Sequence, residues 1–307
     1  MGFLGECKMK TIRKHGELLA LFLFAFAFFI VFKYGPLYGV VIAFKDFKVV
    51  DGIWGSPWVG FQHFQELFQS SDFYRLLKNT LLLNFYQLLF AFPAPIILAI
   101  LLNEVRSRYF QRFIQTTMYL PHFVSWVIMS GLLIYFLSPT TGIMADIMGW
   151  FGKEPIFFMG KKEYFRSIVV GSSILKDLGW GSIIYFAALS GINPEIQESA
   201  IIDGANRWQR IIRINVPSIM PTISIMFILS LGGFLSANFE QIINLLNPVT
   251  FETGDVIDTY VYRVGLQQFQ YSYTAAIGLF KSLVGLVLIL GANLTVKKLS
   301  KGENGLW

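Results

Sequence analysis

Long apolar runs are the feature that most restricts what this chain can fold into. A membrane-spanning helix needs about 20 predominantly apolar residues. About six candidate runs are present, at residues 18–32, 80–102, 113–137, 167–189, 218–239 and 275–296. The first run can continue past Gly35 and Pro36 to Phe44. The pattern predicts an all-α integral membrane protein with about six transmembrane helices.

The charge content agrees with a membrane protein and argues against a nucleic-acid-binding one. Only 14% of the 307 residues are charged, whereas soluble domains carry about 25%. The net charge of +6 comes from short Lys and Arg clusters between the apolar runs, where membrane topology places them. The chain contains no phosphate-binding glycine loop and no aromatic nucleic-acid motif.

The first apolar run follows a basic segment, as a cleavable signal peptide also would. No small residues suited to cleavage follow the run, so we interpret it as a retained anchor. The lone cysteine, Cys7, excludes a disulfide within the chain. Cys7 is a possible lipidation site, but an ordinary cytoplasmic residue is the preferred interpretation.

Lys and Arg are denser in the segments that would lie inside if the N-terminus is cytoplasmic, which favours an N-in, C-in orientation. We therefore expect a cytoplasmic segment at 1–17, a transmembrane domain at 18–296 and a cytoplasmic tail at 297–307. The expected location is the bacterial inner membrane, with multiple passes through membrane lipid.

The inner loop at 193–217 has the sequence signals of two short helices. Asn193 can cap the first helix, with Pro194 in its first turn. Gly204 can take the backbone conformation that ends a helix, and the second helix is expected to reach Pro217. The loop is too apolar for a solvated linker. Either the protein's own helix ends cover it, or a partner does.

This loop resembles the conserved cytoplasmic loop of ABC importer permeases, whose pattern is E-A-A-x3-G-x9-I-x-L-P. Here the pattern reads Glu198-Ser199-Ala200, then Gly204 and Ile214-Asn215-Val216-Pro217. Ser199 replaces an alanine and Val216 replaces a leucine. The resemblance implies a type I ABC importer permease fold and a permease subunit of a binding-protein-dependent importer.

In that family the loop forms a coupling helix that docks in a groove of a cytoplasmic ATPase. The resemblance implies that Glu198 pairs with a basic group of the ATPase. It also implies that Ser199, Ala200 and Gly204 permit close approach. The coupling residues that it implies are Glu198, Ser199, Ala200, Asp203, Gly204, Ala205, Arg207 and Trp208.

The resemblance extends over most of the chain, including 34–47, 115–127 and 255–262. It is to a subgroup that handles oligosaccharides and polysaccharide fragments, among them uronate sugars such as alginate, and more distantly to maltose importers. The implied partners are a second, different permease, a cytoplasmic ATPase dimer and an extracytoplasmic solute-binding protein. No cofactor is expected on this chain, since ATP and Mg would bind to the ATPase.

Polar residues inside the spans are candidates for a substrate path, because they are costly to expose to lipid. Ser172, Ser173, Lys176 and Trp180 share one helix face by their spacing. Trp180 could stack on a sugar and Lys176 could meet a carboxylate, although a structural pair of Lys176 with Asp177 is an alternative. The candidate path residues are Ser172, Lys176, Trp180, Asn238, Phe239 and Glu240.

Other functions fit the sequence less well. A secondary carrier would explain the spans but not the capped apolar loop, and no internal repeat is evident. A permease for another solute class also remains open. An enzyme is not expected, because no catalytic or metal-binding motif and no Walker A sequence is present. ATP hydrolysis must then take place on another chain.

Overall fold

The computed structural model describes residues 16–299, so the segments predicted at 1–17 and 297–307, together with Cys7, lie largely or wholly outside it. The described residues are almost entirely helical, and their only β pairing is an isolated bridge between Lys45 and Trp58. Four helical stretches are long and apolar enough to cross a membrane, and a bent pair makes a fifth. Helix α10 (Lys162–Ser190) supplies the remaining predicted span; it has 29 residues, with Lys176 and Asp177 near its middle.

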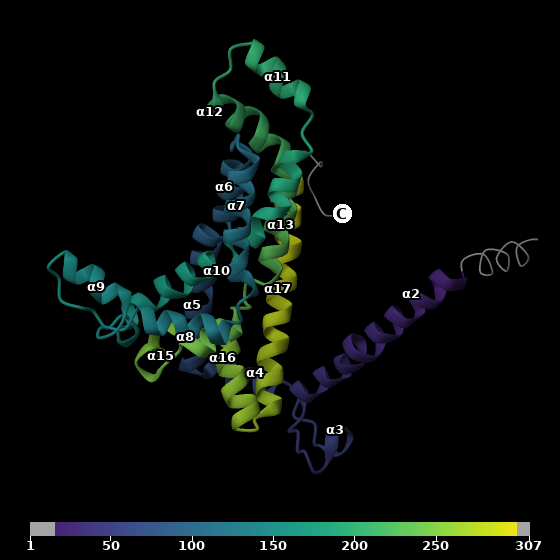
Figure 1. The fold of residues 1–307 in the computed structure, drawn as a ribbon. Coiled ribbons are helices and arrows are strands. Elements are labelled where there is room, and N and C mark those ends of the chain that lie inside the picture. The colour runs from purple at the N-terminus through teal and green to yellow at the C-terminus, as the bar shows by residue number, and fades with distance from the viewer. Residues whose placement is uncertain (1–15, 300–307) are drawn as a thin grey trace, which may run out of the picture.

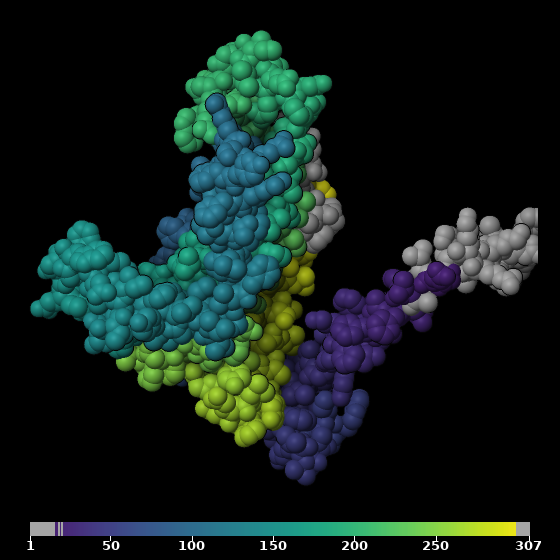
Figure 2. Space-filling model, in the orientation of Figure 1, coloured from purple at the N-terminus to yellow at the C-terminus, as the bar shows by residue number. Residues whose placement is uncertain are grey.

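The first span extends to Phe44, which is the later of the two ends predicted for it, residue 32 and Phe44. It consists of α2 (Gly16–Phe29), a π-helical turn (Ile30–Tyr34) and a 3₁₀ helix (Gly35–Phe44). Figure 1 shows α2 leading away from the helical bundle, and Figure 2 shows the same segment standing apart in space-filling view. Only the 3₁₀ part packs closely on the bundle, against α17 (Tyr271–Leu299).

The second span is longer than the predicted 80–102 and runs from Ser71 to Asn103. Short helices α3 (Gly52–Gly55) and α4 (Gln62–Gln69) precede it. Its parts are α5 (Ser71–Tyr86), a π-helical turn (Gln87–Ala91) and α6 (Pro93–Asn103). In a regular α-helix the ring of Pro93 would clash with the carbonyl four residues earlier. The π turn contains one residue more than an α-helical turn, which removes this clash and lets the helix continue.

The prediction of one continuous span at 113–137 is wrong. The structure has α7 (Arg108–Tyr119), a 3₁₀ turn (Leu120–Phe123) and α8 (Trp126–Phe136), and the two halves are bent by 102°. Pro121 removes one helical hydrogen bond, and Val124 is extended with ψ 131°. The Ser125 hydroxyl then caps α8 by accepting from the backbone N–H of Ile128 at 3.4 Å.

Helix α10 forms the centre of the bundle and packs extensively on α6 and α7. Helix α9 (Ile143–Trp150) and a 3₁₀ turn (Phe158–Gly160) precede it, and α9 projects to one side of the bundle (Figure 1). At the start of α10, Lys162 pairs with Glu252 at 2.6 Å. This ammonium group lowers the pKa of the Glu252 carboxyl.

Gly179 allows α7 to approach the backbone of α10. A methyl group on Gly179 would collide with the backbone carbonyl of Met118. We expect Gly179→Ala to lower stability by about 1–3 kcal/mol through overpacking, measured as a lower thermal unfolding midpoint in detergent. Gly171→Ala on the same helix is the control, because nothing lies within 4 Å of its added methyl group. Equal midpoints for the two variants would contradict the close-approach argument.

The loop after α10 contains α11 (Pro194–Ile202) and α12 (Arg207–Arg210). Contrary to the prediction of a separate second helix that ends at Pro217, the helix continues from Arg207 to Gly232. A π-helical turn (Ile211–Asn215) leads into α13 (Val216–Gly232) and accommodates Pro217.

The predicted span at 218–239 ends earlier, at Gly232, because residues 233–238 form a non-helical connection. The carboxylate of Asp258 holds this connection by accepting from the N–H of Ala237 at 3.0 Å, and it also pairs with Lys281. The remaining elements are α14 (Phe239–Leu245), a 3₁₀ turn (Pro248–Thr250), α15 (Phe251–Gly254), α16 (Ile257–Val261), a π-helical turn (Tyr262–Gln267) and α17.

Candidate functional site: the loop at 193–217 and the polar cavity

The structure confirms the local features expected of the loop at 193–217. The side chain of Asn193 caps α11 by accepting from the backbone N–H of Glu195 at 3.0 Å. Gly204 has φ +78°. The N–H of Ala205 donates to the carbonyl of Ala200 at 2.9 Å, and that of Gly204 to Ile201 at 3.0 Å. This pair of bonds is a Schellman motif, which places Gly204 in the left-handed position after the helix.

A second capped turn joins α11 to the spanning helix. Asn206 and Gln209 form a capping box through reciprocal side-chain to backbone bonds of 2.9 and 2.8 Å. Arg207 Nε donates to Glu104 Oε2 at 2.6 Å, which ties the base of the loop to the end of α6. The loop is thus a built structure that protrudes beyond one end of the bundle (Figures 1 and 2).

The apolar side chains of this loop are exposed, so the protein's own helix ends do not cover them. Ile202 is 84% exposed and Trp208 is 69% exposed, and Ile196 and Ile201 are also about half exposed. Of the predicted coupling residues, Ala200 and Ala205 are half-buried. The exposed ones are Glu198, Ser199, Asp203, Gly204, Arg207 and Trp208. The open apolar surface favours a docked partner over internal packing.

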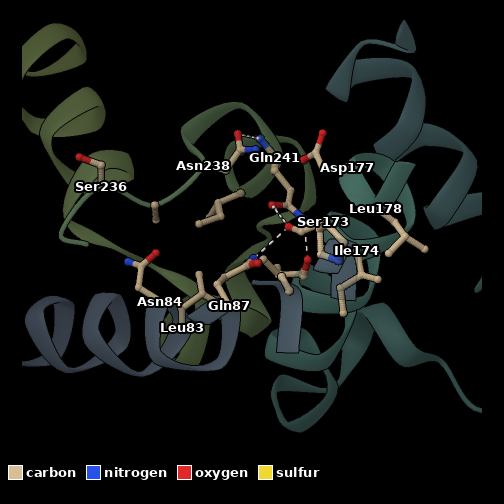
Figure 3. Close-up of a pocket in the computed structure, with 15 residues that line it drawn as sticks. Leu83, Asn84, Gln87, Ser173, Ile174, Asp177, Leu178, Ser236, Asn238 and Gln241 are labelled. Carbon is tan, nitrogen blue, oxygen red and sulfur yellow. Dashed lines mark hydrogen bonds between the residues drawn. The ribbon is translucent and has the colours of Figure 1, made fainter. Parts of the chain in front are cut away.

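A polar cavity of about 270 Å³ lies between the second span, α10 and the connection before α14. Figure 3 shows the polar side chains that line it from these elements. They are Asn84, Gln87, Ser173, Asp177, Ser236, Asn238 and Gln241. A cavity with this many hydrogen-bonding groups among spanning helices is suited to a hydrated, polar solute.

Gln241 organises one wall of this cavity, although sequence reasoning did not select it as a site residue. It is fully buried and accepts from the Ser173 hydroxyl at 3.0 Å. Its amide donates to Ser172 Oγ at 2.8 Å and to the carbonyl of Val169 at 2.7 Å. Gln87 donates to the same Ser173 hydroxyl at 2.9 Å, which links the second span to α10.

The six predicted path residues do not gather in one place. Ser172 is buried in the Gln241 network, whereas Asn238 lines the cavity and caps α14 by accepting from the N–H of Gln241 at 3.4 Å. Phe239 packs on Tyr262 with ring centroids 5.2 Å apart, and Glu240 is exposed. Asn238, Phe239 and Glu240 belong to the separate helix α14 and its cap, not to the end of the fifth span.

Lys176 is buried and does not form the alternative pair with Asp177. Its ammonium group donates to the carbonyl oxygens of His122 at 2.7 Å, Pro121 at 3.4 Å and Val124. These are carbonyls at the break between α7 and α8. Lys176 therefore supplies the hydrogen bonds that the interrupted helix cannot make internally.

Asp177 instead bonds to His122, which lies in the 3₁₀ turn after α7. Nδ1 of His122 lies 2.8 Å from Oδ1 of Asp177. The same imidazole is stacked parallel to the Trp180 indole, with centroids 4.5 Å apart and planes 1° apart. His122 and Asp177 are 55 positions apart in the chain, and the break after α7 brings them together.

An all-helical membrane bundle with a polar internal cavity and a protruding, capped apolar loop defines a membrane transport subunit. Residues 91–301 match the family model described as the binding-protein-dependent transport system inner membrane component. The chain belongs to this family: it is a permease subunit of an ABC transporter, not an enzyme, and passes several times through the inner membrane.

Similar proteins extend over nearly the whole chain. Protein LplB of Bacillus subtilis (strain 168) is 45% identical over 94% of this chain and 91% of its own. The polygalacturonan/rhamnogalacturonan transport system permease protein YteP of the same strain is 43% identical over 91% and 87%. A crystal structure of a bacterial alginate ABC transporter in complex with alginate pentasaccharide-bound periplasmic protein has a chain of TM-score 0.88 and 43% identity, covering 97% and 99%.

Proposed function

We propose that this permease imports oligosaccharides or polysaccharide fragments, uronate sugars among them. Two similar proteins support this substrate class: the polygalacturonan/rhamnogalacturonan permease and the alginate transporter chain. The cavity agrees with it, because amide, hydroxyl and carboxylate groups line it and can exchange hydrogen bonds with sugar hydroxyls. An extracytoplasmic binding protein would deliver the substrate.

The observation that carries the coupling mechanism is the exposed apolar surface of α11 at the cytoplasmic end. Ile201 and Ile202 stand open on a helix that is fixed at both ends by caps. An isoleucine that is exposed in the free chain gains about 1.5–3 kcal/mol when it is buried. We infer that α11 docks on a cytoplasmic ATPase, one of a pair, which would bind ATP with Mg.

Closure of the ATPase dimer would move α11, and the cap and the Arg207–Glu104 contact would pass this movement to the spanning helices. A shift between inward-open and outward-open states requires that the ATPase bind the two states with different affinities. Glu198, Ser199 and Asp203 are exposed on or beside α11 and are the candidates for polar contacts with the ATPase.

A second, different permease would complete the path. The first span supports this proposal, because its phenylalanines from Phe22 to Phe32 are exposed and it packs closely on the bundle through its 3₁₀ end. A second membrane-spanning chain or membrane lipid would cover this surface. The cavity also opens at the surface of this subunit, and a facing subunit would enclose it.

The test is copurification from native membranes in mild detergent, with Ile202→Asp as the variant. A charge at this 84% exposed position does not disturb the fold but opposes burial in a partner. We expect the copurified nucleotide-hydrolysing subunit to fall roughly tenfold or more, as for a central interface residue. Val50→Asp is the matched control, since Val50 is 97% exposed and follows the first span, so an N-in orientation places it on the side of the membrane opposite the ATPase.

Equal recovery of the ATPase with wild type and Ile202→Asp would contradict docking through α11. A wild-type chain that purified alone and transported solute without ATP would replace the importer with a secondary carrier.

A further inference from the structure

His122, Asp177 and Trp180 form one compact cluster, built from the break after α7 and from α10. His122 bonds to Asp177 at 2.8 Å and stacks on Trp180 at 4.5 Å, and Phe123 lies edge-on to the indole at 5.9 Å. Trp180 nevertheless remains 48% exposed. The cluster thus presents an ordered aromatic surface with a carboxylate and an imidazole at its edge.

The position of this cluster indicates that it faces water and not lipid. Helix α10 has 29 residues, about 1.5 Å each, and Asp177 lies near the middle of its length. The side chains of Asp177 and His122 are 47% and 31% exposed. Exposed polar side chains at this depth are costly in hydrocarbon. Asp177 also lines the polar cavity, so the cluster borders a hydrated route.

We propose that His122, Asp177 and Trp180 form a saccharide subsite in this route, and that it recognises sugar hydroxyls and not carboxylates. The proposal rests on the proposed function. The uncovered part of the Trp180 indole would stack on the C–H face of a pyranose, because the ring face is electron-rich and the C–H groups are weakly positive. The Asp177 carboxylate would accept bonds from hydroxyls, while His122 holds it in position.

The preference for hydroxyls follows from charge. Lys176 is the cation adjacent to Asp177 in the chain, and its three N–H donors are directed to the carbonyls of Pro121, His122 and Val124. In this conformation it has no donor left for a substrate carboxylate. Asp177 is itself an anion and repels a uronate carboxylate placed beside it. The subsite is therefore suited to an uncharged sugar unit, or to the hydroxyl-bearing edge of a charged one.

The test uses the complete importer with its binding protein in proteoliposomes, and ATP-driven uptake of three labelled probes. The probes are tetragalacturonate, its fully methyl-esterified form and arabinotetraose. We expect Trp180→Ala to raise the KM for the transported probes about threefold to tenfold. Asp177→Asn should raise uptake of tetragalacturonate relative to its methyl ester, because it removes the repelling charge. Neither change should lower the thermal unfolding midpoint appreciably.

Leu175→Ala is the matched control, since Leu175 is a 54% exposed apolar residue on the same helix and on a different face. If wild type takes up none of the probes, the proposed function is overturned and the subsite with it. If wild type takes up a probe while Trp180→Ala leaves KM unchanged and Asp177→Asn leaves the acid-to-ester ratio unchanged, only the subsite is overturned.

Discussion

Replacing Gly204 by valine is expected to abolish ATP-driven uptake while the helical bundle stays folded. Gly204 has φ +78°, which a β-branched residue adopts only at a cost of about 1–2 kcal/mol. No atom of this chain lies within 4 Å of an added Cβ, so the strain within the chain comes from the backbone. Relief of the strain would break the two Schellman bonds and turn α11 away from its docking position.

The control for this prediction is Gly204→Asn, because asparagine adopts the left-handed region more readily than valine does. Uptake and binding-protein-stimulated ATP hydrolysis are measured for both variants in proteoliposomes, with unfolding midpoints in detergent. We expect asparagine to retain most of the uptake and valine to lose nearly all of it. Valine with full uptake would mean that the backbone turn at Gly204 is not needed for coupling.

The spanning helices were predictable because each depends on a local run of apolar residues. The break in the third span was missed for the same reason. The apolar run continues through Pro121 and Val124, whereas the direction of the chain changes there by 102°. Pro121 and the cap residue Ser125 were signals of a break. The residues on both sides of them are apolar enough to face lipid, however, so composition did not separate the two halves.

The local structure of the loop at 193–217 was largely predictable because its determinants are close in sequence. Asn193, Gly204 and Pro217 act within a few residues of their own positions, although Pro217 turned out to lie inside a continuous helix. The cavity could not be predicted in this way. Gln241 bonds to Ser172 and Ser173, which are 69 and 68 positions away, and no local pattern indicates such a pairing.

Lys176 shows why a polar residue inside a span is not by itself a substrate contact. Its position on the predicted polar face of α10 suggested a role toward the substrate, and the spacing was consistent with that. The structure places its ammonium group against the backbone carbonyls of a different span. The carbonyls at the break after α7 need a hydrogen-bond donor, and this break was not predicted from the sequence.

Replacing Lys176 by methionine is therefore expected to cause a large loss of stability. Removing a buried charge by itself recovers desolvation energy, and for some buried ion pairs this makes apolar replacement neutral. Here the partners are backbone carbonyls, which no substitution removes. All three lose a charged donor, but the carbonyl of Pro121 keeps the backbone N–H of Val124 at 3.2 Å, so those of His122 and Val124 are left unmet. Each lost bond to the ammonium group contributes about 1.5–3 kcal/mol. The two unmet carbonyls outweigh the recovered desolvation energy, and we expect a net loss of at least about 3 kcal/mol.

The measurement is the thermal unfolding midpoint of the purified chain in detergent, where this loss corresponds to a fall on the order of 5 °C. Lys162→Met is the matched control, because Lys162 begins the same helix and pairs with Glu252 on the surface, where an ion pair contributes little. The stacking of His122 on Trp180 should loosen in Lys176→Met and not in the control, since Lys176 holds the carbonyl of His122. An unchanged midpoint in Lys176→Met would show that water or a rearranged backbone satisfies the break without the lysine.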